Sequence, residues 1–128
     1  MKRAFLLVGL VVLFPALLCA EPWTKKQILL EVASETMILM DYGQTLNIAR
    51  NPQKYSEMNP IIGRHPSTEA VSRYFISWII IHPIVTHFLP SKSKDHKWIN
   101  RENWQYVTIA VEAGAVGNNL SIGIGVRF

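Results

Sequence analysis

The sequence has little cysteine and little charge. Cys19 is the single cysteine among 128 residues, and only 17% of the residues are charged. One cysteine forms neither an internal disulfide nor a multi-thiolate zinc site, so both are excluded. Low charge, 49% hydrophobic residues and a mean hydropathy of +0.16 are atypical of a disordered chain or a hydrophilic soluble module. A membrane or exported protein is therefore the leading class.

The chain also lacks the motifs of several enzyme and binding classes. It has no phosphate loop, no dinucleotide fingerprint, no H-E-x-x-H metal motif and no nucleophile-elbow glycine motif. Its 13 basic and 9 acidic residues give a net charge of +4, but the basic residues are scattered. This excess is too small to indicate nucleic-acid binding. We expect one small domain with no cofactor.

The first twenty residues have the pattern of a targeting segment. Lys2 and Arg3 precede the apolar run 4–18, and the small residue Ala20 ends the segment. A basic start, an apolar run and a small residue at the cleavage position are typical of a Sec-type signal peptide. The sequence therefore predicts a signal peptide followed by a single helical domain, 21–128.

Two alternatives remain for this first segment. The apolar run is just short of the roughly 18 to 20 residues that span a membrane, so an uncleaved membrane anchor stays open. Cys19 stands where a bacterial lipoprotein carries its lipid, but Leu18 before it argues against lipidation.

Three later segments carry helical patterns. Segment 25–49 begins after Thr24, a good N-cap residue, and ends before Asn51-Pro52, which stops a helix. Segment 70–89 is the most hydrophobic segment of the chain after residue 20. Segment 104–120 contains pairs of small residues four positions apart, which let helix backbones approach closely in lipid. We predict an all-α fold with a bundle of about three main membrane-embedded helices.

The last eight residues, 121–128, follow a different pattern. Apolar side chains alternate there with glycine and arginine. Because a period of two is typical of a strand, we predict a short extended C-terminal tail that forms a strand.

The candidate site consists of polar residues on the helices and in one turn, with the proline of that turn: Asp41, Gln44, Thr45, Glu57, Asn59, Pro60, His82, Thr108, Glu112 and Asn119. An ionised carboxylate in hydrocarbon costs about 2.5 to 3.5 kcal/mol, so Asp41 and Glu112 should face the bundle interior, paired or protonated. We expect the polar face of segment 25–49 to meet that of segment 104–120, with His82 as the nearest candidate cation. Residues 57–60 are expected to form a turn that re-enters the packed region.

Most of these residues belong to four motifs. They are D-Y-G-Q-T at 41–45, E-M-N-P-I-I-G at 57–63, W-Q-Y-V-T at 104–108 and E-A-G-A-V-G-N-N at 112–119. In these motifs the chain resembles a group of small uncharacterised proteins encoded by proteobacteria and their phages. The resemblance implies a helical protein of the bacterial inner membrane or envelope and brings no established activity.

The expected function is non-enzymatic. We expect a membrane or envelope protein that acts through helix-helix or protein-protein contacts, with membrane lipid, a second copy of itself or another envelope protein as partner. One alternative is an intramembrane hydrolase or metal-binding protein that uses Asp41, Glu57, His82 and Glu112. A metal is not the first expectation, because His82 and His87 lie on different faces of a helix. A phage-type membrane-lesion or exclusion factor and a soluble helical bundle are further alternatives.

Overall fold

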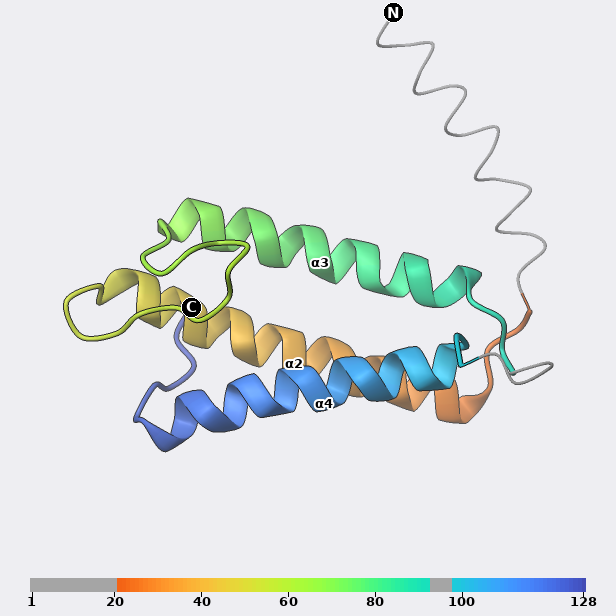
Figure 1. Ribbon diagram of the computed structural model, residues 1–128. Coiled ribbons are helices and arrows are strands. Elements are labelled where there is room, and N and C mark those ends of the chain that lie inside the picture. The colour runs from red at the N-terminus through yellow and green to blue at the C-terminus, as the bar shows by residue number, and fades with distance from the viewer. Residues whose placement is uncertain (1–20, 93–97) are drawn as a thin grey trace, which may run out of the picture.

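Figure 1 shows the computed structural model of the protein. The structure describes residues 21–92 and 98–128. The predicted targeting segment, including Cys19, lies outside the described residues. The described part forms three α-helices and no strand, which confirms the predicted all-α fold with three main helices.

Each helix begins at a residue whose side chain accepts a backbone N–H of the first turn. Thr24, Ser67 and Asn100 are these N-cap residues, and Thr24 forms a reciprocal capping box with Gln27. The helices span Lys25–Arg50 (α2), Thr68–Phe88 (α3) and Arg101–Ser121 (α4). In this described part, no helix combines the length and the apolar character needed to cross a membrane.

Helix α2 is the centre of the bundle. It packs along both other helices, whereas α3 and α4 contact each other much less. Figure 1 shows α2 antiparallel to α3 and running in the same direction as α4, so the start of α2 lies at the same end as the start of α4. Side chains on two faces of α2 therefore form most of the interior.

The apolar core is small and lies toward the end of α2 and the start of α3. Ile38 and Leu46 of α2 pack with Val71 and Phe75 of α3. The Phe75 ring stacks on Tyr42, with ring centroids 5.3 Å apart. Burial of these side chains supplies the hydrophobic contribution that joins α2 to α3.

The C-terminal tail packs across α2 at Gly43. The Arg127 N–H donates to the Gly43 carbonyl oxygen at 3.1 Å, and Ile124 is buried. A Cβ atom at position 43 would lie 2.5 Å from Val126 Cγ1, so glycine is needed for this close approach. The predicted strand is wrong, because the tail lies against a helix and pairs with no other strand in the described part.

Candidate functional site

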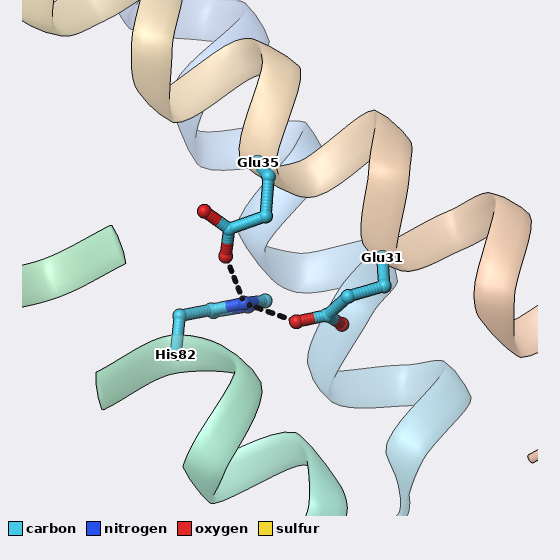
Figure 2. Close-up of side chains that lie close together, drawn as sticks. All are labelled: Glu31, Glu35 and His82. Carbon is cyan, nitrogen blue, oxygen red and sulfur yellow. Dashed lines mark hydrogen bonds and ion pairs between the residues drawn. The ribbon is translucent and has the colours of Figure 1, made fainter. Parts of the chain in front are cut away.

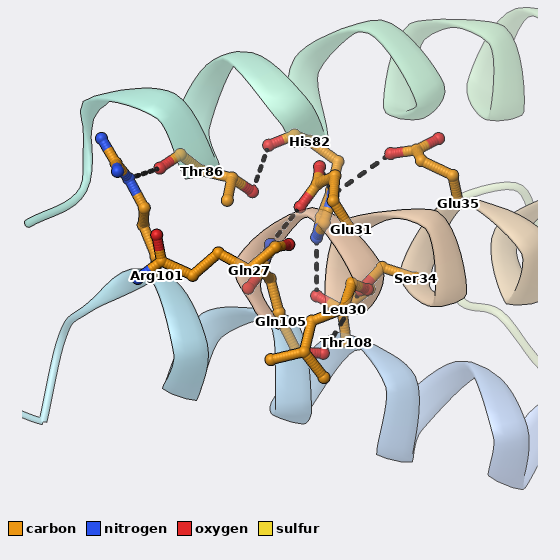
Figure 3. Close-up of polar contacts among 10 residues, drawn as sticks. All are labelled: Gln27, Leu30, Glu31, Ser34, Glu35, His82, Thr86, Arg101, Gln105 and Thr108. Atoms are coloured by element: carbon orange, nitrogen blue, oxygen red, sulfur yellow. Dashed lines mark hydrogen bonds and ion pairs between the residues drawn. The ribbon is translucent and has the colours of Figure 1, made fainter. Parts of the chain in front are cut away.

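Polar side chains line much of the interior of the bundle. Those buried on the three helices are Gln27, Glu31, Ser34, Gln44, Thr45, Asn47, His82, Thr86, Arg101, Gln105 and Thr108. Figure 3 shows many of them pointing into the space between the helices. Together with partly buried carboxyl side chains they define two groups: a histidine cluster (Glu31, Glu35, His82) and a carboxyl cavity (Asp41, Glu57, Glu112).

The histidine cluster joins α2 to α3. His82 is fully buried, and its Nδ1 atom lies 3.0 Å from Glu31 Oε1 and 3.2 Å from Glu35 Oε1. Figure 2 shows the two glutamates, one turn apart on α2, directed toward this one nitrogen. Because ionised carboxylates only accept hydrogen bonds, both contacts are hydrogen bonds when the imidazole carries a proton on Nδ1.

Helix α4 contacts the atoms of this cluster that do not take part in the contacts between His82 and the glutamates. The other ring nitrogen, His82 Nε2, lies 3.0 Å from Thr108 Oγ1, and Gln105 Nε2 donates to Glu31 Oε2 at 2.7 Å. The Trp104 ring stacks on the His82 ring, with centroids 5.5 Å apart. The imidazole therefore has contacts at both nitrogens and on its face, which fixes its orientation.

Arg101 closes the end of the bundle beside this cluster. Its side chain is fully buried and donates to the carbonyl oxygens of Thr86 (3.1 Å), His87 (2.8 Å) and Pro22 (3.4 Å). The guanidinium also lies over the Trp23 ring. The last carbonyls of a helix lack intrahelical donors, so Arg101 supplies donors to the end of α3 and ties α4 to it.

The carboxyl cavity lies toward the opposite end of the bundle. Asp41, Glu57 and Glu112 line it, and its volume is about 430 Å³. The Asp41 carboxyl forms a hydrogen bond with the Glu112 carboxyl. Asn119 Nδ2 donates to Asp41 Oδ1 at 3.4 Å and to Gln44 Oε1 at 3.1 Å. This cavity is the place where α2 and α4 bring acidic groups together.

A turn after α2 holds the third carboxyl of the cavity. Glu57 Oε1 accepts the N–H groups of Met58 and Asn59, both at 2.8 Å, and Asn59 Oδ1 accepts the N–H of Ile61. Pro60 is exposed within this turn. Glu57 Oε2 is buried and has no hydrogen-bond partner among the described residues. The turn thus positions a carboxyl with one unpaired oxygen beside the cavity.

The cavity carboxyls have altered proton affinity. Burial, followed by the negative charges of Glu112 and Glu57, raises the pKa of Asp41 to about 7. Burial also raises the pKa of Glu112, although its hydrogen bond with Asp41 acts in the opposite direction. Both carboxyls therefore bind a proton more strongly than they would in water.

The two glutamates of the histidine cluster differ from each other. Burial raises the pKa of Glu35. Burial acts on Glu31 in the same direction, but hydrogen bonds with His82 and Gln105 outweigh it and hold the pKa of Glu31 below its ordinary value. Glu31 consequently binds a proton less strongly than Glu35 does.

The structure brings some of the sequence-predicted residues together and separates others. Asp41 and Gln44 on α2 contact Asn119 on α4, and Asp41 contacts Glu112. Thr45 is buried, but in the described part its side chain forms no hydrogen bond with α4. Thr108 contacts His82, whose ring nitrogens are directed to it and to two glutamates outside the predicted set.

The candidate site predicted from the sequence does not include Glu31, Glu35, Gln105 or Arg101. One signal was present: Glu31 and Glu35 are like charges four positions apart, an arrangement that destabilises an isolated helix. Such a pair needs a compensating partner from another element. The sequence does not indicate that His82, 47 positions after Glu35, is this partner.

Comparisons with protein-family models, curated proteins and solved structures give no match for this chain.

Proposed function

We propose that this is a small non-enzymatic protein of the bacterial inner membrane or envelope, exported by a Sec-type signal, which acts through helix-helix or protein-protein contacts. The observation that supports the proposal is an inverted distribution of polarity. In the described residues, polar side chains outnumber apolar ones inside the bundle, and large apolar side chains are exposed outside. A protein surrounded by water has the opposite tendency.

The apolar outer face extends over all three helices. It includes Ile28, Leu29, Val32 and Leu39 of α2, Ile76, Ile80, Ile81 and Ile84 of α3, and Tyr106, Val107 and Val111 of α4. Exposed apolar surface on this scale is typical of a lipid or protein contact. Lipid is the partner that matches a face present on every helix.

Exposed charges are placed at the helix ends. On α2, Lys25, Lys26 and Arg50 are exposed, and no exposed charge lies between Lys26 and Arg50. On α3 none follows Arg73, and α4 exposes none. Basic groups beyond an apolar face suit the anionic headgroups that flank lipid chains.

Hydropathy averaged along a helix does not describe its outer surface. Polar residues such as Gln44, His82 and Gln105 lower the average hydropathy of their helices, yet they face the interior. The surface offered to lipid is therefore more apolar than the sequence average, and the proposal depends on that surface.

Helix α4 also offers a surface for a second helix. Ala110, Ala113, Gly114 and Gly117 are exposed, and a Cβ atom at either glycine would meet nothing within 4 Å. Small residues at this spacing let two helix backbones approach closely. This surface supports contact with a second copy or another envelope protein.

Carbonate extraction of isolated membranes tests the proposal. We expect the wild-type protein to stay in the membrane pellet, because apolar contact and not charge holds it there. The variant Ile80→Glu/Ile84→Glu places two carboxylates on the outer face of α3 and should move the protein into the carbonate supernatant. The matched control, Gln53→Glu, adds the same side chain in the exposed loop after α2 and should stay in the pellet.

Two outcomes would contradict this proposal. Release of the wild-type protein by carbonate would favour a soluble helical bundle. Equal retention of the Ile80→Glu/Ile84→Glu variant and the Gln53→Glu control would show that the outer face of α3 makes no lipid contact.

The remaining functional candidates have less support from the geometry. A hydrolase or metal site built on Asp41, Glu57, His82 and Glu112 needs these four side chains together. Asp41, Glu57 and Glu112 line the cavity. The ring nitrogens of His82 are directed elsewhere, to Glu31, Glu35 and Thr108. A membrane-lesion or exclusion factor would use the same apolar outer face, and toxicity on expression would distinguish it.

A further inference from the structure

The histidine cluster has the composition of a metal site. Glu31 and Glu35 project from successive turns of α2, and His82 faces them from α3 (Figure 2). The ligand atoms of the three residues all lie within 4.8 Å of one another. Carboxylate oxygens and imidazole nitrogens are both ligands that proteins use for zinc and related divalent metals.

The spacing of the donor atoms agrees with coordination. In a tetrahedral site with bonds of about 2.0 Å, neighbouring donor atoms lie roughly 3.3 Å apart. His82 Nδ1 lies 3.0 Å from Glu31 Oε1 and 3.2 Å from Glu35 Oε1. Small movements of the carboxylates are therefore sufficient to replace a proton on Nδ1 by a metal ion.

The atoms around the cluster support the same assignment. Metal-binding imidazoles usually have their second nitrogen held by a hydrogen bond, which directs the first toward the metal. Thr108 Oγ1 contacts Nε2 of His82, and Gln105 Nε2 holds Oε2 of Glu31, so Oε1 and Nδ1 face each other. These contacts come from α4, which makes the arrangement a property of the whole bundle.

The charge balance also favours a cation. The hydrogen bonds and ion pairs of Glu31 and Glu35 in the described part include no lysine or arginine. Glu35 Oε2 is buried and has no hydrogen-bond partner among the described residues. A protonated imidazole would balance one of the two carboxylates, whereas a divalent ion balances both.

We propose that Glu31 Oε1, Glu35 Oε1 and His82 Nδ1 bind one divalent transition-metal ion of the zinc class. Metal binding at Nδ1 requires the neutral tautomer with its proton on Nε2: the proton on Nδ1 leaves to water, water protonates Nε2, and Nε2–H then donates to Thr108 Oγ1. The ion joins α2 to α3. The imidazole ligand favours zinc-like ions over Ca²⁺ and Mg²⁺, which prefer oxygen donors.

Cobalt titration of the full chain tests the site directly. The protein is purified without a histidine tag, treated with EDTA and dialysed, and Co²⁺ is then added while visible absorption is recorded. We expect a saturable signal at one equivalent with the intensity of four-coordinate Co²⁺, which Zn²⁺ abolishes by displacement. Mg²⁺ in excess should leave the signal unchanged.

The variant Glu35→Gln removes one ligand and keeps the size of the side chain. Its Co²⁺ affinity should fall by about tenfold or more. The control Glu102→Gln changes another partly buried glutamate, which pairs with Lys26 away from the cluster, and should stay within about twofold of the wild type. Circular dichroism confirms that each variant is folded. If Glu35→Gln does not fold, Thr108→Val keeps all three ligands and should weaken Co²⁺ binding several-fold.

The titration has clear negative outcomes. Absence of a saturable one-equivalent signal in the wild-type protein overturns the proposal. A signal of equal affinity in wild type and Glu35→Gln, or in wild type and Thr108→Val where that variant replaces it, indicates adventitious surface binding and overturns it too. Carbonate extraction does not depend on this metal, so the two proposals fail separately.

Discussion

The two ends of the bundle are stabilised by different physical means. Around Phe75, α2 and α3 meet through a compact apolar cluster. Around His82, the same two helices meet through a buried histidine with two glutamates, and α4 adds Gln105 and Thr108. Apolar contacts are non-directional, whereas hydrogen bonds at the polar end require one relative placement of all three helices.

This difference separates stability from specificity. The apolar end gains free energy from each side chain that is removed from water. The polar end gains little net free energy per hydrogen bond, but an unpaired buried group there is costly. Substitutions at the two ends should therefore lower the free energy of unfolding by different amounts. At the polar end the loss should also depend more strongly on the chemistry of the new side chain.

The largest expected effect is that of Phe75→Ala. Phe75 is fully buried and stacks on Tyr42, so its truncation removes apolar contacts and leaves a cavity. We expect the free energy of unfolding of the purified protein to fall by about 3 to 5 kcal/mol, as measured by denaturant titration.

The neighbouring residue provides the control for this substitution. The Ile76 side chain is 50% exposed, so Ile76→Ala should cost about 1 kcal/mol or less. Similar losses for the two alanine variants would show that Phe75 is not at the centre of the apolar core.

A smaller effect is expected for Gln105→Leu at the polar end. The substitution keeps the volume of the side chain but removes the donor to Glu31 Oε2 and to the Gln27 carbonyl oxygen. We expect a loss of about 1 to 3 kcal/mol, measured with EDTA present so that no metal contributes. Val107→Leu, an exposed change on the same helix, should be close to neutral. A neutral or stabilising result for Gln105→Leu would mean that Glu31 has no need of this donor.

The fold was more accessible from the sequence than the site. The helical pattern and the cap residue Thr24 located α2, and the residue pattern without any cap located α3 and α4 with errors of up to three residues at their ends. These signals are local, since a helix depends on residues within a few turns. The tail at 121–128 was misread because its alternating pattern is the same whether it packs on a strand or on α2.

The partners within the site depended on information that is not local. The polar face of α2 was visible, so Asp41 and Gln44 were expected to face α4. The position of α3 along the axis of α2 decides that His82 meets Glu31 and Glu35 instead of Asp41. The lengths of the loops alone do not determine this position. Buried Arg101 likewise gains its role only when the end of α3 supplies free carbonyl oxygens.

The expected effect that is smallest over any one pH unit is a change in the pH dependence of stability on replacement of Asp41. The pKa of Asp41 rises on folding from its ordinary 3.8 to about 7, through burial and the negative charges of Glu112 and Glu57. Between these values the folded protein binds more protons than the unfolded chain, so this group makes stability fall as the pH rises toward 7. The dependence on Asp41 ends above its folded pKa, where both states are ionised. We expect the slope of the free energy of unfolding against pH to be shallower in Asp41→Asn than in the wild type, by up to about 1.4 kcal/mol per pH unit. Denaturant titration across this pH range measures both slopes. Equal slopes in the two proteins would show that Asp41 ionises without a penalty and that the carboxyl cavity is open to water.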